Sequence, residues 1–184
     1  MLPFVSRPIM QKKSMDALGR LTAEEARHAG RTQVRVVLDN VRSMHNVGSV
    51  FRTSDAFMLE GIELCGYTPR PPHRDIHKTA LGATETVPWR GWNHAAEAVR
   101  QLSVDGYRLL AVEQTTGSVF LHQLDFPANE RLAVVFGNEV EGVGADVLAL
   151  CAGSIEIPQL GMKHSLNVSV AAGMVLWEIC RGRF

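Results

Sequence analysis

Polar residues that could take part in catalysis or binding follow several apolar segments of this sequence. In the stretch from His164 to Cys180, Ser165 and Asn167 stand at the start of an otherwise apolar segment. Ser and Asn side chains accept hydrogen bonds from the free N–H groups of a first helical turn, so capping is one interpretation. The other is that these groups belong to a ligand site at the mouth of the helix.

A second polar group surrounds Gly48, with Asn46 before it and Arg52 after it. The residues around Arg52 are mostly apolar, and a buried guanidinium is unfavourable unless it meets an anion. A salt bridge to Asp55, or a surface position, would explain this arginine equally well. The sequence therefore leaves open whether Arg52 binds an anion or has a structural role.

The third polar group is FGNEVEGVG, which begins at Phe136 and carries Glu139 and Glu141. It is not a P-loop, because Val143 rather than lysine follows Gly142, and it lacks the GxGxxG spacing of dinucleotide-binding proteins. Its glycines predict a tight turn. Two glutamates in that turn would repel phosphate and suit a cation or a hydroxyl, although such glutamates are often simply exposed.

Each polar group follows a short apolar run that is typical of a buried strand. Runs of this kind, bounded by Gly, Asp, Asn or Pro and separated by helical spacing, predict an α/β fold with a mainly parallel sheet and helices on both faces. Ligands bind beyond the carboxyl ends of the strands in such sheets, where the three polar groups fall. The expected strands are 34–39, 62–67, 107–113, 132–137 and 154–158, and the expected helices are 47–58, 93–103, 144–151 and 166–181.

Two other segments differ from this pattern. Residues 1–33 have helix-forming composition and predict one or two small helices that lie on the domain or reach toward a partner. The Pro-rich segment 68–81 predicts a long surface loop. The last expected helix has the clearest apolar stripe, which consists of Leu166, Val170, Met174 and Trp177.

The composition predicts a single cytoplasmic domain. The chain has 184 residues, of which 46% are hydrophobic and 21% charged, and its formal net charge is zero. Any polyanionic partner must therefore be bound by local basic clusters, such as the one from Pro69 to Lys78. There is neither a secretory signal nor an apolar run long enough to span a bilayer. The cysteines are expected to be buried free thiols in a reducing compartment, and they are Cys65, Cys151 and Cys180.

Metal binding and hydrolysis find little support in the sequence. His73 and His77 have the i, i+4 spacing of a metal pair, but the prolines before them argue against a helix and no third ligand is evident. We therefore expect no metal site. The GxSxG motif of hydrolases is absent.

The three polar groups, in this order, resemble the three motifs of the SpoU/TrmH family of RNA ribose 2′-O-methyltransferases, within the SPOUT superfamily. NVGSVFRTSDAF resembles motif 1, VVFGNEVEGVG motif 2, and IPQLGMKHSLNVSVAAGMVLWE motif 3. YTPRPPHRDIHKTALGATETVPW resembles the loop that follows the second strand in many members. Together these segments cover nearly everything from residue 35 to residue 181.

The resemblance implies a fold and an assembly that the residues alone do not predict. The C-terminal segment would form a trefoil knot that holds S-adenosylmethionine, and two chains would form a homodimer with active sites at the subunit interface. Residues 1–33 would be an N-terminal helical extension and 34–184 a SPOUT methyltransferase domain. Met174 and Trp177 suit a dimer surface, although burial in the chain's own core would explain them as well.

The resemblance also assigns roles by position. The catalytic residues would be Asn46, Arg52, Glu139, Ser165 and Asn167. The cofactor-binding residues would be Gly137, Ile157 and Leu166, with Gln114 and Thr115, just beyond the expected strand 107–113, as additional neighbours. Gly137 would let a ligand approach the backbone, and Ile157 and Leu166 would supply apolar walls for adenine. Glu141 departs from the family pattern, because relatives often have a small or basic residue there.

Methylation of a ribose would require the protein to align the reactants and to help remove a proton. A guanidinium almost never loses its own proton, so we expect Arg52 to bind the adjacent phosphate and to stabilise the developing alkoxide. We expect a compact RNA such as tRNA rather than ribosomal RNA. The alternatives are a noncatalytic RNA-binding protein with a knotted fold and a base-directed RNA methyltransferase. The expected RNA-binding residues are Arg70, Arg74, Lys78, Lys12 and Lys13.

Overall fold

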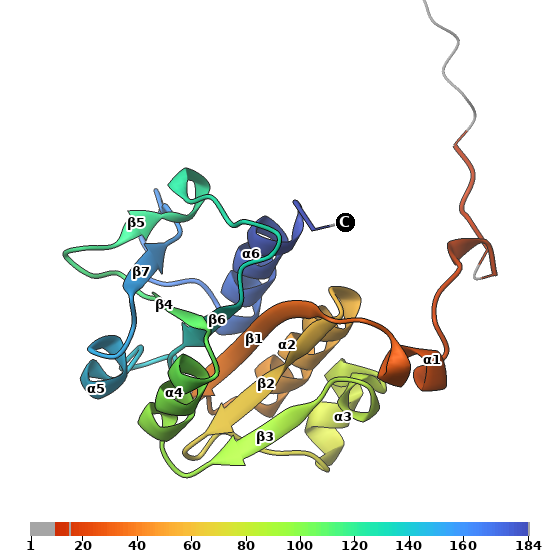
Figure 1. Cartoon of the computed structure of the whole chain (residues 1–184), viewed down its shortest axis with the longest axis horizontal. Helices are drawn as coiled ribbons and strands as arrows, with labels where there is room; N and C mark the ends of the chain where they lie inside the picture. The colour runs from red at the N-terminus through yellow and green to blue at the C-terminus, as the bar shows by residue number, and fades with distance from the viewer. Residues whose placement is uncertain (1–9, 15, 184) are drawn as a thin grey trace, which may run out of the picture.

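The apolar runs of the sequence pair into one parallel sheet (Figure 1). The computed structural model describes residues 10–14 and 16–183, and within them the sheet has seven strands in the order β3-β2-β1-β6-β4-β7-β5. All of the strand pairings are parallel, which confirms the predicted α/β class. The strands are β1 (Thr32–Asp39), β2 (Leu59–Cys65), β3 (Trp89–Trp92), β4 (Arg108–Val112), β5 (Val119–Phe120), β6 (Leu132–Phe136) and β7 (Gly153–Glu156).

Helices cover both faces of the sheet, because successive strand side chains point to opposite sides. Val36 and Leu38 of β1 pack in the core beneath α2, α3 and α6, whereas Val37 packs beneath α4 and α5. The α-helices are α1 (Ala23–His28), α2 (Met44–Ala56), α3 (Arg74–Ala80), α4 (Ala95–Val104), α5 (Ala145–Leu148) and α6 (Val168–Cys180), and the 3-10 helices are η1 (Asp16–Leu18), η2 (Ala83–Glu85) and η3 (Leu121–Gln123).

The sheet order brings the expected polar groups to one edge. β6 pairs with β1 on one side and with β4 on the other, and β7 pairs with β4. Because all four strands run in parallel, their carboxyl ends meet at the same edge of the sheet. The segments that follow β1, β6 and β7 carry the three polar groups and are therefore neighbours there.

Two short strands and one helix were not predicted. β3 and β5 have four and two residues and lie at the two edges of the sheet, where few apolar residues are needed. The expectation of a loop throughout 68–81 is wrong, because α3 occupies its second half. Ile76 and Ala80 of α3 are buried against α2, and the His73 side chain caps the helix by accepting the Asp75 N–H at 3.2 Å.

The apolar stripe of α6 faces away from the core of its own chain. Helix α6 is apolar on nearly all sides, and its core-facing residues include Ala172, Leu176 and Ile179. Burial of the stripe in the chain's own core, which the sequence had left open, is therefore wrong. Leu166 lies before the start of α6, at the cavity described below, and the exposed fractions of the other stripe residues are 52% for Val170, 44% for Met174 and 54% for Trp177.

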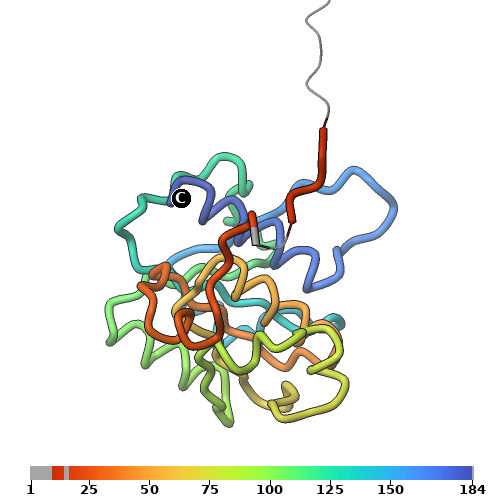
Figure 2. The backbone as a smooth tube through the Cα atoms, turned by 90° about the vertical axis from the view of Figure 1, so that its right-hand side faces the viewer, coloured from red at the N-terminus to blue at the C-terminus, as the bar shows by residue number. Residues whose placement is uncertain are grey.

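The N-terminal segment forms small helices, as its composition predicted. Thr22 and Glu25 form a capping box at the start of α1. Arg31 joins this region to the sheet by donating to the carbonyls of Ala26, Leu59 and Thr86. The described residues before α1 extend away from the domain (Figures 1 and 2).

The three cysteines are free thiols, as expected, but their burial differs. Cys65 and Cys180 are buried, whereas Cys151 is half-buried. Burial raises the pKa of Cys151 and of Cys180 to about 11, so both stay protonated at neutral pH. In the part of the chain that the structure describes, no helix has the length and apolar character needed to cross a bilayer.

Candidate active site

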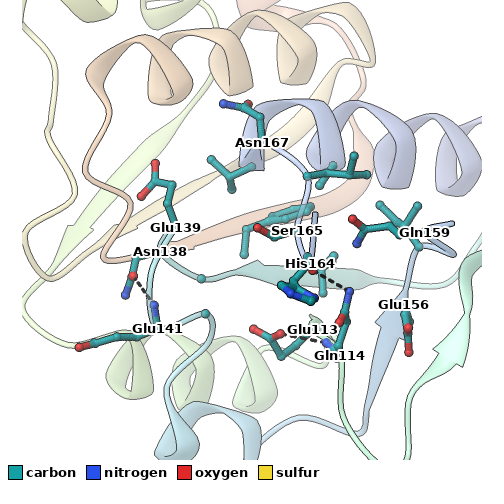
Figure 3. A pocket seen from close by; sticks show the side chains of 18 of the residues that line it. Glu113, Gln114, Asn138, Glu139, Glu141, Glu156, Gln159, His164, Ser165 and Asn167 are labelled. Atoms are coloured by element: carbon teal, nitrogen blue, oxygen red, sulfur yellow. Dashed lines mark hydrogen bonds between the residues drawn. The ribbon is translucent and has the colours of Figure 1, made fainter. Parts of the chain in front are cut away.

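A cavity of about 490 Å³ opens at the carboxyl ends of β4, β6 and β7 (Figure 3). Its size lies within the range of small-molecule sites. Its walls are the turn after β6, the segment between β7 and α6, and the residues that follow β4. Side chains and backbone at the cavity come from Val112, Glu113, Gln114, Phe136, Gly137, Asn138, Glu139, Val140, Glu141, Gly142, Ile155, Glu156, Ile157, Gln159, His164, Ser165, Leu166, Asn167, Val168 and Ala171.

The turn after β6 is held by its own backbone. Asn138 and Gly142 exchange two backbone hydrogen bonds, at 3.1 and 3.2 Å, and the Asn138 side chain accepts the N–H groups of Val140 and Glu141, each at 2.8 Å. A Cβ atom at Gly137 would collide with the backbone of Gly142. Gly137 is thus required by the turn itself, rather than only by a ligand as the sequence suggested.

Glu113 fastens this turn to the end of β4, a role that the sequence analysis missed. Its carboxylate accepts the Val143 N–H at 3.0 Å and the Gln114 N–H at 2.9 Å. A Cβ atom at Gly142, whose φ is +69°, would collide with the same carboxylate. The position of Glu113 directly after an apolar strand was the only signal in the sequence, and nothing there pointed to a turn about thirty residues away.

Three of the expected catalytic residues form one hydrogen-bonded network. Asn46 donates through Nδ2 to Glu139 Oε1 at 3.1 Å, and Asn167 donates through Nδ2 to Asn46 Oδ1, also at 3.1 Å. Ser169, which was not predicted, donates to the Asn167 side-chain oxygen at 2.7 Å. The network joins the starts of α2 and α6 to the turn after β6.

The two helix starts are capped by side chains from different groups of residues. Ser43 caps α2, and Asn46 lies within its first turn. Asn167 does cap α6, because its side-chain oxygen accepts the Ser169 and Val170 N–H groups at 2.9 and 3.4 Å. Ser165 lies before the helix, where it lines the cavity without capping. Asn167 therefore serves both as a cap and as a member of the network.

Four of the five expected cofactor residues line the cavity. Ile157 and Leu166 supply apolar wall, and Gly137 contributes backbone. Gln114 Nε2 donates to the His164 carbonyl at 3.1 Å, which ties the end of β4 to the segment before α6. Thr115 lies outside the lining, and its hydroxyl meets that of Ser154 at 2.6 Å.

The charge of the cavity is acidic. Among the described residues, its lining contains four glutamates and neither lysine nor arginine. Glu156 accepts the Ser118 hydroxyl, and Glu141 points away from the middle of the cavity in Figure 3. Such a lining suits a ligand with positive charge and disfavours a dinucleotide with its phosphates.

Arg52 lies on the solvent face of α2, outside the cavity of its own chain. It has neither an ion pair nor a hydrogen bond to any residue that the structure describes. Asp55, its expected structural partner, instead accepts the Thr86 hydroxyl at 2.7 Å. In a single chain, Arg52 therefore has a surface position and does not form the salt bridge to Asp55. Its guanidinium is free to bind an anion.

The expected RNA-binding residues fall in different surroundings. Arg70 donates to the Trp92 carbonyl at 2.7 Å, and Lys78 forms an exposed ion pair with Asp75 at 2.6 Å. Arg74 is exposed at the start of α3, and exposed Lys12 and Lys13 precede η1. The structure thus places all five side chains at the surface.

The histidine pair that resembles a metal motif is not assembled into a site. His73 caps α3, and His77 is part of that helix. The prolines before His73 therefore do not prevent a helix here. Across residues 10–14 and 16–183, the structure holds no group of three or more His, Cys, Asp or Glu side chains placed to bind a metal ion.

A parallel sheet with a lined cavity at its carboxyl edge defines an α/β protein that binds a small ligand at the strand ends. The residues that build this cavity all lie within residues 33–177, which match the model for the SpoU rRNA methylase family. The chain belongs to this family. The resemblance that the three motifs suggested is thereby confirmed.

Individual relatives agree with this assignment. A tRNA (guanosine(18)-2′-O)-methyltransferase of Thermus thermophilus is 34% identical over 164 residues, which cover 89% of this chain and 82% of the relative. The AdoMet-bound rRNA methyltransferase structure from Sinorhizobium meliloti is 27% identical with a TM-score of 0.77, and the match covers 86% of this chain and 60% of that one. The A. aeolicus TrmH/SpoU tRNA modifying enzyme is 25% identical, also with a TM-score of 0.77, and the match covers 88% and 82% of the two chains.

Some relatives are considerably longer than the matched region. A TrmH family tRNA/rRNA methyltransferase of Staphylococcus haemolyticus is 31% identical over 148 residues, and the match covers 80% of this chain but 58% of that relative. The match thus spans little more than half of that relative's length.

Proposed function

We propose that this chain is an S-adenosylmethionine-dependent methyltransferase that modifies a ribose 2′-hydroxyl in RNA, with tRNA as its substrate. The observation that carries the proposal is the network of Asn46, Glu139 and Asn167 at the mouth of the cavity. Each of these residues comes from a different motif of the family. Membership in the family and the tRNA relative in Thermus thermophilus support the reaction and the substrate.

The lining of the cavity suits the proposed cofactor in its apolar surface and its charge. Ile157 and Leu166 offer apolar surfaces for the adenine ring, and the glutamates of the lining suit the positive charges of the sulfonium and the amino group. When bound, the cofactor supplies a methyl group already activated by the positive charge on sulfur. The chain's own residues must then deal with the acceptor hydroxyl, which is barely acidic at neutral pH.

The network at the mouth of the cavity positions that acceptor. Asn46 and Asn167 are held to each other and to Glu139, so their remaining polar groups are oriented before RNA arrives. Ser165 lies in the lining between them and the cofactor walls. Arg52 binds the phosphate next to the acceptor ribose and stabilises the alkoxide as it develops, while keeping its own proton.

Arg52 reaches a reaction centre across a dimer interface in this proposal. The exposed stripe of α6 provides the apolar surface that such an interface needs. Helix α6 runs beside α2, as shown by the contact of Asn167 with Asn46 at one end and of Trp177 with Phe57 at the other, where the ring centroids are 6.3 Å apart. A second chain docked on this face would bring the Arg52 of one subunit toward the cavity of the other.

A trefoil knot in the C-terminal segment is part of the same proposal. After β7, the chain forms a wide loop (Figure 2) and returns to α6, which packs against α2. That path passes the turn after β6. Residues 1–33 would then be an extension and 34–184 the methyltransferase domain. The proposed substrate implies a cytoplasmic location.

The proposal is tested by analysing the nucleosides of an RNA after reaction. An unmodified tRNA transcript pool is incubated with the protein and S-adenosylmethionine carrying a deuterated methyl group, digested, and examined by mass spectrometry. We expect a labelled 2′-O-methylnucleoside. A label on a base would instead indicate a base-directed enzyme, and RNA binding without any label would indicate a noncatalytic RNA-binding protein.

A further inference from the structure

An exposed aromatic ring stands beside an arginine whose backbone adjoins Glu139 of the cavity lining. The ring of Tyr67 is part of a side chain that is 53% exposed, and the guanidinium carbon of Arg42 lies 5.5 Å from the ring centroid. The backbone N–H of Arg42 points to Glu139 Oε2 at 3.5 Å. The pair therefore adjoins the network that the proposed function places around the acceptor ribose.

The backbone around the ring is fixed by buried contacts. The Tyr67 N–H donates to Asn40 Oδ1 at 3.2 Å. The next residue, Thr68, is buried, and its hydroxyl donates to the Leu38 carbonyl and accepts the Val41 N–H, at 3.1 and 3.0 Å. These bonds join the corner after β2 to the end of β1. Because the backbone of this corner is already fixed, the exposed ring can bind a ligand with little loss of backbone entropy.

Gly66 shows how closely this corner is packed. Its φ is +62°, and a Cβ atom there would collide with the Asn40 side chain that holds the Tyr67 N–H. Asn40 itself has a positive φ of 56°. Two successive strand ends thus adopt left-handed backbone conformations that set the position of the ring and of the arginine.

The charge of the surroundings gives Arg42 a specific role. The cavity lining is acidic, so RNA phosphates are repelled from its interior. Arg42 stands next to Glu139, and its guanidinium, on which the charges of Glu139 and Glu141 act, forms no ion pair with the described residues. A guanidinium over a ring offers both a cation for a phosphate and a planar group beside a stacking surface.

We propose that Tyr67 and Arg42 form a subsite for one unpaired nucleotide of the RNA, next to the acceptor ribose. The base stacks on the exposed part of the Tyr67 ring, and the Arg42 guanidinium binds the phosphate of the same nucleotide. The inference rests on the proposed function, because it assumes that RNA is the substrate of this cavity. It goes beyond that function by naming residues outside the cavity lining that hold the RNA in place.

The test measures RNA affinity and catalysis separately. A fluorescently labelled tRNA transcript that the wild-type protein binds is titrated with each variant in the presence of saturating S-adenosylhomocysteine. KM and kcat for the same RNA are measured in parallel, and calorimetry gives the affinity for S-adenosylhomocysteine without RNA. The variants are Tyr67→Ala, Tyr67→Phe, Arg42→Ala and, as a matched control, Arg100→Ala on the exposed surface of α4.

The Tyr67→Ala variant should bind the RNA at least about tenfold more weakly than the wild-type protein, because it lacks the ring on which the base stacks. This is the usual scale for such a contact. KM should rise to match, and the affinity for S-adenosylhomocysteine should stay the same. Tyr67→Phe should lose less affinity, because the ring remains. In Arg42→Ala, the slope of log affinity against log salt concentration should decrease by about one, as expected for one lost phosphate contact.

Two results would overturn the subsite. The first is that Tyr67→Ala and Arg42→Ala have the same RNA affinity, KM and salt dependence of binding as the control Arg100→Ala. The other is a parallel loss of S-adenosylhomocysteine affinity, which would show that the ring supports the fold instead of contacting RNA. A wild-type protein that binds the RNA without methylating it would refute the proposed function, while the titrations would still decide the subsite.

Discussion

At the scale of single residues, the site depends on side chains that meet from distant parts of the chain. Asn46 lies 93 residues from Glu139 and 121 from Asn167, yet hydrogen bonds join all three. The sequence predicted this set through its order of motifs. It did not predict Glu113 or Ser169, because an acidic residue after a strand and a serine in a first helical turn are common, and their roles depend on contacts that only the fold creates.

Arg52→Ala should reduce RNA methylation at least about a hundredfold, the usual scale for losing a group that stabilises charge in a transition state. The side chain is exposed and has no partner among the described residues, so the variant should fold normally. Steady-state methylation and calorimetry with S-adenosylmethionine test this. Arg100→Ala is the control, and unchanged turnover in Arg52→Ala would remove this residue from the mechanism.

Asn167 offers a way to separate helix capping from the network. Asn167→Ala should destabilise the protein by about 0.5 to 2 kcal/mol through loss of the cap of α6. Asn167→Ser should keep the cap, because serine is an equally good acceptor, but it lacks the amide that donates to Asn46. We expect near-normal thermal stability with much reduced methylation for the serine variant. Wild-type activity in Asn167→Ser would show that the network does not act on the substrate.

At the scale of elements, periodicity and strand composition predicted five of the strands and four of the helices. The Pro-rich segment was misjudged because α3 is short and owes its stability to tertiary contacts rather than to its composition. Its Ile76 and Ala80 pack against α2, where Gly48 allows the two helices to approach closely. The sequence showed Gly48 as a motif residue and gave no sign of the second helix.

Gly48→Ala is a test of that close approach. In an isolated helix the change would be stabilising by about 1 kcal/mol. Here a Cβ atom would collide with the Ile76 carbonyl and the Thr79 side chain, so the clash should prevail and destabilise the protein by about 1 to 3 kcal/mol. Ser103→Ala, at an exposed position of α4, should be slightly stabilising. Chemical denaturation measures both, and a gain in stability for Gly48→Ala would contradict the packing described for α2 and α3.

At the scale of the whole molecule, the proposed dimer would explain together the apolar stripe of α6 and the position of Arg52. A single chain leaves the stripe exposed and keeps Arg52 outside its own cavity. The sequence could suggest a helix with an apolar stripe but not which side of α6 meets the core, because its other residues are nearly as apolar. An active site shared between chains would need both of these features.

The complementation of two inactive variants tests this central claim most directly. Arg52→Ala lacks the cation, and Glu139→Ala lacks the carboxylate that holds Asn46. Each variant alone should form little 2′-O-methylnucleoside. If Arg52 acts on the partner's cavity, co-refolded mixtures of the two should recover a substantial share of wild-type activity, because each mixed dimer contains one intact centre. Mixtures no more active than the separate variants, with mixed dimers shown by native mass spectrometry, would contradict a reaction centre assembled from two chains.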